Sequence, residues 1–315
     1  MWRRNWNWMM TTLCRSVVAI IPLLFWAGVV LPSELVCRPL QISEIPYPGP
    51  DEFGQGLLWK VSREGLPPSY VFGTIHVVER HVSEQLDKVR AVLAASEVFV
   101  MEAVPGPDDI ALMRRMMFFD DGTRLQDVIS ADLYTQTLMV LRAYHLMEND
   151  VATMKPWAAY LTMSYPAEMG MVLDQQLLHL ARTGEAAARG LESMEELGGV
   201  FNSLSLADQV RLLTDAVCHR EILEGDFAKM ISLYTEGDLA GLFSYGQRYS
   251  FDDNTVYENL TDKILTRRNY RMVERMQPIL ERGAAFIAIG ALHLPGAEGV
   301  LALLEKHDFE ITRVF

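Results

Sequence analysis

The chain has 315 residues, half of them hydrophobic, so it is long enough to bury a sizeable core in one large domain or two small ones. Its formal net charge of −13 at pH 7 would repel phosphate backbones and anionic lipid surfaces. No basic patch with interleaved aromatic residues offsets this charge, so the composition argues against a nucleic-acid partner.

Residues 1–40 are predicted to be a signal peptide or an N-terminal membrane anchor with a short linker. Arginines precede an apolar run at residues 17–31, as in an export signal. As a helix this run would span about 22 Å, short of the roughly 30 Å hydrocarbon core of a bilayer, which favours a signal peptide. No clean small-x-small cleavage site follows, so an uncleaved membrane anchor remains an alternative. In both cases the rest of the chain is expected outside the cytoplasm, in the periplasm or another extracytoplasmic space.

The cysteines limit the covalent cross-links that the chain can form. Cys14 precedes the apolar run, whereas Cys37 and Cys218 lie in the part that is expected to be exported. These two can form one disulfide, but the sequence contains no disulfide framework.

Residues 41–315 are predicted to form one α/β domain, with a single, mostly parallel sheet flanked by helices. In chain order, the first expected elements are a linker at 41–55, strands at 57–62 and 70–75, a helix at 84–95 that Ser83 caps, and a strand at 98–102. The two first strands are joined by a Gly- and Pro-rich turn and are expected to form a hairpin. The next strand, helix and strand form a β-α-β unit.

A large helical insertion is expected between the sheet-forming N- and C-terminal parts. Its expected elements are helical patterns at 108–183 and 206–282, a short strand at 186–191, and a helix that begins with a capping box of Ser193 and Glu196. A strand at 286–289, a helix with Pro295 in its first turn and a last strand at 309–315 complete the domain. These strands are too few for two sheets.

Two short segments share one pattern, an apolar run closed by Gly-x-x-His. The first ends at His76 and the second at His293. Each run is typical of a buried parallel strand, so both histidines are expected at carboxyl ends of strands, where open α/β sheets bind ligands. A single histidine in such a place is most often a hydrogen-bonded loop residue. The repeated context favours a shared metal or catalytic site for the two.

Two glutamates also lie at the ends of expected strands. Glu102 closes an otherwise apolar strand, and Glu192 stands where a short strand meets a helix cap. A buried carboxylate needs a cation or a hydrogen-bond network, so both are candidates for the same site. The structural alternatives are that Glu102 is the first exposed residue after its strand and that Glu192 serves the helix dipole.

Arg268 occupies an apolar stripe of the helix that is expected after Thr261. The stripe consists of Leu265, Met272, Met276 and Ile279, and Arg268 fills its missing step. A guanidinium on a core face needs an anionic partner, which is Glu102, Glu192 or the developing oxyanion of a substrate. The alternative is that Arg268 lies at the edge of the stripe and extends its charge into solvent.

Five short motifs occur together in one order: Phe72-Gly73-Thr74-Ile75-His76-Val77, the strand that ends in Glu102, Gly190-Leu191-Glu192-Ser193, Arg268-Asn269, and Ile289-Gly290-Ala291-Leu292-His293-Leu294-Pro295-Gly296. In this order, over roughly residues 55–315, the chain resembles the TraB/PrgY/GumN family, close to its GumN-like bacterial branch. The resemblance implies a metal-dependent hydrolase fold that is related to the TIKI proteases.

The family's paired histidines and its glutamate match His76, His293 and Glu102, which are therefore the expected metal ligands. Glu192 is the candidate general base or fourth ligand, and Arg268 is the candidate for stabilising the oxyanion. Such ligands suit Zn²⁺, Mn²⁺, Co²⁺ or Fe²⁺, and the resemblance favours Mn²⁺ or Co²⁺. The expected function is an exported or membrane-tethered metallohydrolase of the peptidase kind, with a peptide or small-molecule substrate. The alternative is a non-catalytic protein that binds a peptide or small ligand in the same crevice.

Overall fold

The structure is a computed structural model that describes residues 35–167, 170–184 and 186–315. The apolar run at residues 17–31, predicted to be a signal peptide or anchor, lies outside the described residues. Within the described ranges, no helix is both long enough and apolar enough to cross a membrane.

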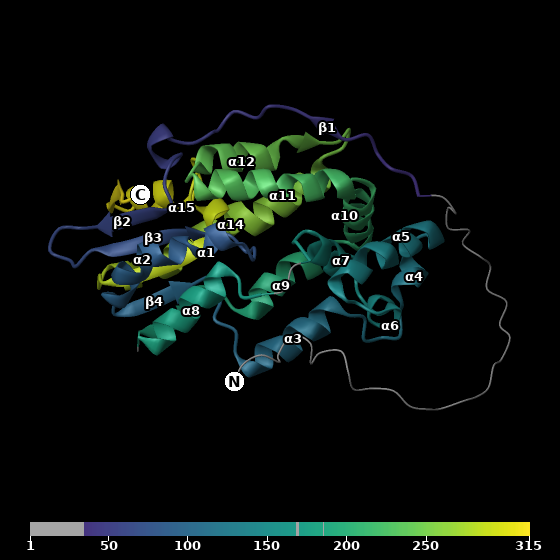
Figure 1. Ribbon diagram of the computed structural model, residues 1–315, viewed down its shortest axis with the longest axis horizontal. Helices are drawn as coiled ribbons and strands as arrows, with labels where there is room; N and C mark the ends of the chain where they lie inside the picture. Colours follow the sequence, from purple (N-terminus) through teal and green to yellow (C-terminus); the bar gives the residue numbers. More distant parts are fainter. Residues whose placement is uncertain (1–34, 168–169, 185) are drawn as a thin grey trace.

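A six-stranded sheet lies at one end of the molecule (Figure 1), in the order β5-β4-β7-β3-β2-β8. Its strands are β2 (Leu58–Ser62), β3 (Ser69–Thr74), β4 (Val98–Met101), β5 (Ala187–Gly190), β7 (Ala285–Gly290) and β8 (Glu310–Arg313). The neighbours β5, β4, β7 and β3 run parallel, whereas β2 is antiparallel to both β3 and β8. The predicted α/β fold is confirmed, and the sheet is mixed.

The burial of the strands follows their place in the sheet. The central strand β7 is buried along almost its whole length, and β3 is buried at all but one position. Both are mostly apolar, as expected of strands that helices cover on both faces. Because β3, β7 and β4 are adjacent and parallel, their carboxyl ends meet at one edge of the sheet.

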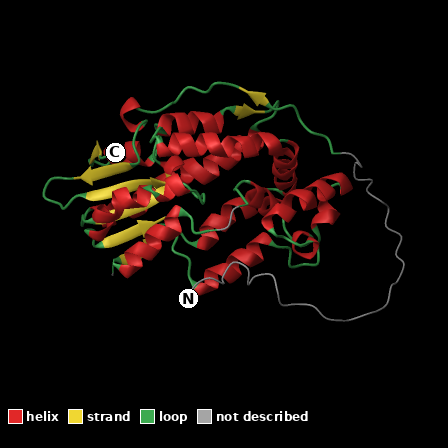
Figure 2. Cartoon of the chain, in the orientation of Figure 1, coloured by secondary structure: helices red, strands yellow, loops and turns green. Residues whose placement is uncertain are grey.

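Helices make up most of the remaining chain (Figure 2). They are α1 (Arg80–Ser83), α2 (Gln85–Ala94), α3 (Pro107–Met117), α4 (Leu125–Val128), α5 (Ala131–Leu141), α6 (Glu148–Val151), α7 (Pro156–Met163), α8 (Leu173–Thr183), α9 (Met194–Asn202), α10 (Leu206–Cys218), α11 (Arg220–Thr235), α12 (Leu239–Gln247), α13 (Thr255–Thr261), α14 (Arg267–Leu280) and α15 (Val300–Glu305). A short ladder also pairs β1 (Gln41–Ile42) with β6 (Tyr249–Ser250), so the expected linker takes part in the fold.

The buried side chains fall into two main cores. One joins the six-stranded sheet to helices that include α2, α8, α12, α14 and α15. The other lies away from the sheet, among α4, α5, α6, α7 and α10, and contains Trp157. The helical part between β4 and β7 is therefore divided, since some of its helices cover the sheet and others form a separate bundle.

Two predicted helix starts are wrong and one is confirmed. Ser83 ends α1 instead of capping the next helix, because the Glu79 side chain caps α1 by accepting from the backbone N–H of Val82 at 3.1 Å. Pro295 lies in a turn, and α15 begins only at Val300. The capping box of Ser193 and Glu196 opens α9 as predicted, with a 3.1 Å bond from the Glu196 N–H to the Ser193 hydroxyl.

A disulfide joins Cys37 to Cys218, with a distance of 5.6 Å between their Cα atoms. It ties the segment before β1 to the end of α10. Arg38 strengthens the connection through an ion pair with Asp215 of α10. The sequence left this pairing open, and the structure forms it.

Candidate metal centre

The carboxyl ends of three adjacent parallel strands carry the predicted ligands. His76 lies two residues beyond β3, and Glu102 directly follows β4. His293 ends the single 3₁₀ turn Ala291–His293 that follows β7. Because β7 lies between β3 and β4, the two Gly-x-x-His segments and Glu102 meet at one edge of the sheet.

Glu102 contacts the second Gly-x-x-His segment directly. Its Oε1 accepts a hydrogen bond from the backbone N–H of Gly290 at 2.7 Å and lies 3.7 Å from Nε2 of His293. A methyl group at Gly290 would lie 3.2 Å from the same oxygen, which is closer than most such contacts. Glycine at this position therefore lets the carboxylate approach the backbone, in agreement with the close approach that a strand glycine predicts.

Each histidine has a buried acceptor at its Nδ1 atom. The Nδ1 of His76 lies 2.8 Å from Oδ2 of Asp174, whose other oxygen accepts from the Thr74 hydroxyl at 2.7 Å. The Nδ1 of His293 lies 2.6 Å from Oδ1 of Asn269. When Nδ1 donates to such an acceptor, the lone pair of a neutral imidazole is on Nε2, which is the arrangement of metal-binding histidines.

Arg268 links the two glutamates that the sequence singled out. Its guanidinium donates from Nη2 to Oε2 of Glu102 at 2.5 Å and from Nε to Oε2 of Glu192 at 2.8 Å. The side chain is only 10% exposed, so it does not extend into solvent at the edge of the helix. The anionic partners of Arg268 in this structure are thus both glutamates.

Glu192 lies between two arginines. Its side chain is fully buried, and Arg271 pairs with the carboxylate oxygen that Arg268 leaves free. Both oxygens therefore take part in ion pairs. This contact pattern favours a role for Glu192 in holding Arg268 over the predicted roles of general base or fourth ligand.

A π-helical turn precedes Arg268 on its helix. It spans Asp262–Thr266 and joins α13 to α14. Arg268 also donates from Nη1 to the backbone carbonyl of Ile264 in this turn, at 3.2 Å. Such wide turns leave backbone groups free for other partners and often occur at functional sites. Sequence periodicity, which assumes an uninterrupted helix, does not reveal the turn.

The charges of the site determine its protonation. Burial raises the pKa of Glu102, but the charges of His293 and Arg268 outweigh this effect and hold the pKa at about 2. Burial lowers the pKa of His293 to about 4. Burial also lowers the pKa of His76, but the Asp174 carboxylate more than offsets this and raises it to about 9. At neutral pH, Glu102 is therefore an anion and His293 a neutral imidazole, whereas His76 is protonated and would release this proton on binding a metal.

Among the residues that the structure describes, no group of three or more His, Cys, Asp or Glu side chains is arranged so that it could hold a metal ion. The chemistry of the donors nevertheless fits a divalent metal. Two imidazoles with acceptors at Nδ1 and one ionised carboxylate are borderline ligands of the type that Zn²⁺, Mn²⁺ and Co²⁺ accept. The residues that would hold it are His76, Glu102 and His293.

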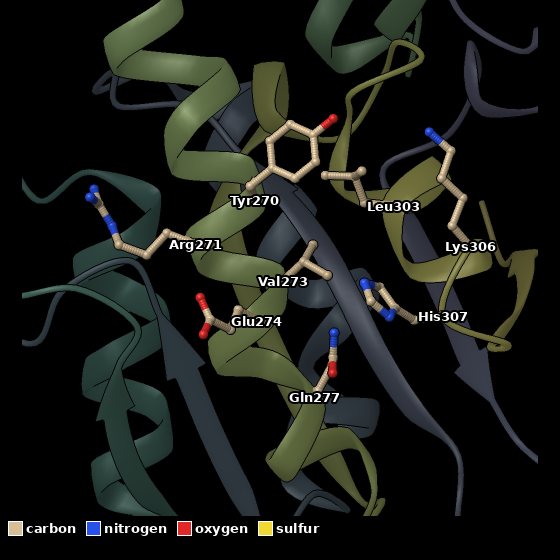
Figure 3. Close-up of a pocket in the computed structure, with 8 residues that line it drawn as sticks. All are labelled: Tyr270, Arg271, Val273, Glu274, Gln277, Leu303, Lys306 and His307. Carbon is tan, nitrogen blue, oxygen red and sulfur yellow. The ribbon is translucent and has the colours of Figure 1, made fainter.

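A separate groove of about 570 Å³ lies between α14 and α15 (Figure 3). Tyr270 and Val273 of α14 face Leu303 and Lys306 across it. With 3.6 residues per turn, Tyr270 and Val273 project from a different face of α14 than Arg268 does. This groove therefore does not contain the histidine and glutamate cluster.

Sequence reasoning missed two residues of the cluster. Asp174 lies in the first turn of α8, and Asn269 follows Arg268 in α14; both are buried. The sequence feature that could have indicated Asp174 is an acidic residue among the leucines of an amphipathic helix. A sequence pattern alone does not show which histidine such a residue contacts.

A mixed six-stranded sheet flanked by helices, with two histidines and a glutamate after its parallel strands, defines an α/β protein. The chain belongs to the TraB/PrgY/gumN family, whose profile matches residues 57–313. Its placement in the GumN-like branch stays a prediction.

Among the relatives are Metalloprotease TIKI2 of Xenopus tropicalis, with 25% identity over 92% of this chain and 66% of the relative, and Metalloprotease TIKI2 of Danio rerio, with 26% identity over 81% and 60%. Metalloprotease TIKI1 of Homo sapiens is 24% identical over 81% of this chain and 61% of the relative. The chain thus spans less than two thirds of the length of these relatives. No solved structure matches it.

Proposed function

We propose that the chain is a metal-dependent peptidase in which His76, Glu102 and His293 hold one divalent metal. One observation carries the proposal: both histidines of the repeated motif have a buried acceptor at Nδ1, beside a carboxylate that is ionised at neutral pH. Metal-binding histidines are oriented by such acceptors. The names of the relatives, which are metalloproteases, support the same assignment.

A divalent cation held by His76, Glu102 and His293 would supply Lewis-acid activation of a water molecule and of a substrate carbonyl. The protein supplies the positions of the ligands. Asp174 and Asn269 fix the two imidazole rings, and the backbone N–H of Gly290 fixes Glu102. Mn²⁺ or Co²⁺ is the proposed metal, on the family resemblance, with Zn²⁺ as the alternative that the ligands also accept.

Arg268 is proposed to keep Glu102 charged and in place, and to stabilise negative charge that develops on the substrate. Glu192 holds Arg268 from the side away from solvent, since its side chain is fully buried, and Arg271 pairs with the other oxygen of Glu192. In this proposal Glu192 is a positioning residue.

The protein is proposed to act outside the cytoplasm, exported or tethered to the membrane through residues 17–31. The disulfide between Cys37 and Cys218 supports this proposal, because disulfides persist in oxidising compartments and are rare in the cytosol. The proposed substrate is a peptide or another small molecule, and the net charge of −13 disfavours a nucleic acid.

Incubation of the purified full chain with a mixed peptide library tests the proposal. The metal-free chain is compared with the chain supplied with Mn²⁺, Co²⁺ or Zn²⁺, and new peptide termini are identified by mass spectrometry. We expect cleavage that depends on added metal and is lost in His76→Ala. Binding of peptides without cleavage under every metal would instead support the non-catalytic alternative.

A further inference from the structure

The three predicted ligands differ in their exposure to solvent. His76 has a side chain that is 40% exposed, whereas those of Glu102 and His293 are 14% and 6% exposed. Arg268 and Glu192 are also buried. A substrate must therefore approach along the exposed face of His76.

Tyr165 stands beside this exposed face. It belongs to the loop that connects α7 with α8, and its ring centroid lies 6.4 Å from that of His76, with the planes tilted by 59°. The residue is 39% exposed, so its ring has a free surface next to the imidazole. No sequence pattern in this loop singled out the tyrosine.

The backbone that carries Tyr165 is held in place. The hydroxyl of Tyr144 donates to the carbonyl of Tyr165 at 2.7 Å, and Arg220 donates from Nη2 to that same hydroxyl at 2.9 Å. Arg220 also donates from Nη1 to the carbonyl of Met163 at 2.6 Å. Rigid support of this kind is what a binding residue needs if it is to hold a ligand in one position.

We propose that Tyr165 is a substrate-positioning residue, whose ring forms the wall of the entrance beside His76 and packs against the peptide that is to be cleaved. The inference rests on the proposed peptidase function for the identity of the ligand. A tyrosine ring offers a large, rigid contact surface with few rotatable bonds, which suits it to hold a flexible peptide. The ring lies next to the most exposed of the predicted ligands, so a bound peptide would lie across both.

Binding can be measured without turnover. A pool of random hexapeptides with a fluorescent label is titrated with the metal-free full chain, and fluorescence anisotropy reports the dissociation constant. We expect Tyr165→Ala to weaken binding about tenfold, which is the size of effect that loss of a well-packed aromatic contact produces. Tyr165→Phe keeps the ring and should bind within about twofold of the wild type, by the same contact argument.

Tyr270→Ala is the matched control. Tyr270 is 50% exposed and lines the groove between α14 and α15, so its removal should leave peptide binding unchanged. Equal melting temperatures of the three variants and the wild type would exclude a loss of fold as the cause. Unchanged binding in Tyr165→Ala, or a wild type that binds none of the peptides, would overturn the inference.

Cleavage assays with metal separate this inference from the proposed function. In the active protein, Tyr165→Ala should raise KM about tenfold and change kcat little, since the lost contact is made equally in the ground state and the transition state. Binding that depends on Tyr165 without any cleavage would support the inference and contradict the peptidase. Cleavage with an unchanged KM in Tyr165→Ala would support the peptidase and contradict the inference about Tyr165.

Discussion

The carboxylate of Glu102 and the guanidinium of Arg268 form a 2.5 Å hydrogen bond across 166 positions of sequence. The same guanidinium contacts Glu192, so Arg268 pairs with two carboxylates, and Arg271 supplies the second positive charge at Glu192. Burying a charge without a partner is costly, and it is the pairing that makes this arrangement stable.

Removal of this arginine should therefore destabilise the fold. Arg268→Ala leaves Glu102 without its cation, and we expect the free energy of unfolding to fall by about 3–5 kcal/mol. Urea unfolding followed by circular dichroism measures the change. Arg267→Ala is the control, because the neighbouring Arg267 is 67% exposed and pairs with Asp262 at the surface, where such pairs contribute less than about 1 kcal/mol. Equal losses in the two variants would contradict a buried pair.

The acceptor at His76 should control metal affinity. Asp174→Ala removes the group that orients the His76 ring, and we expect Mn²⁺ or Co²⁺ to bind about 10–100-fold more weakly. Asp174→Asn should lose less metal affinity, since the amide oxygen of Asn269 already accepts at the Nδ1 of His293. Calorimetric titration of the metal measures both variants.

The control for this titration is the Glu79→Gln variant. Glu79 also accepts at the Nδ1 of a histidine, His81, at 2.8 Å, but the side chains of this pair are more exposed, at 27% and 66%. Its removal should leave metal affinity unchanged. An effect as large as that of Asp174→Ala would show that the loss is not specific to the site.

The ion pair of Glu196 with Arg275 should make part of the stability depend on pH. Hydrogen bonds from Arg275 and from the N–H of Ser193 lower the pKa of Glu196 from 4.5 to about 2. A carboxyl whose pKa is lower in the folded state stabilises the fold above its unfolded pKa, and this contribution is lost as the pH falls through the folded pKa. The loss should therefore occur between about pH 4.5 and pH 2.

Glu196→Gln tests this dependence, because glutamine preserves the capping box but not the charge. We expect the variant to be about 0.5–1 kcal/mol less stable at neutral pH, as for other partly exposed pairs. The difference in melting temperature from the wild type should shrink below pH 4.5. Glu195→Gln, at the exposed neighbouring position, should show no such trend. A deficit that persists unchanged at pH 3 would count against the ion pair.

The disulfide should stabilise the protein through its long loop. Cys37 and Cys218 are 181 positions apart, and closing a long loop restricts the unfolded chain. Cys37→Ser combined with Cys218→Ser is expected to reduce the free energy of unfolding by about 2–4 kcal/mol. Thermal melts with and without reductant measure this effect, and reductant should lower the melting temperature of the wild type but not of the double variant. An unchanged melting temperature of the reduced wild type would refute the prediction.

The position of the cluster could be predicted from the sequence because neighbouring parallel strands end at the same edge of a sheet. Apolar runs before His76 and His293 identified central strands, and the carboxyl ends of such strands meet at one edge. These inferences use local patterns whose consequences the sheet geometry fixes.

The partners of the cluster could not be predicted in the same way. Asp174 contacts His76 across 98 positions, from a helix whose orientation depends on tertiary packing. For Arg268, the sequence named Glu102, Glu192 or a substrate oxyanion as possible partners. The π-helical turn at Asp262–Thr266, which precedes Arg268, departs from the α-helical periodicity that the sequence analysis assumed. The helix start at Pro295 failed because a 3₁₀ turn and a further loop intervene before α15.

The stoichiometry of metal binding tests the central claim most directly. Mn²⁺ and Co²⁺ are titrated into the chelator-treated full chain, His76→Ala and His293→Ala, and circular dichroism verifies that each variant is folded. The account predicts one metal per wild-type chain and a loss of this site in both variants, since each removes a ligand of the same ion. Unchanged binding in the two folded variants would contradict a metal centre at these histidines.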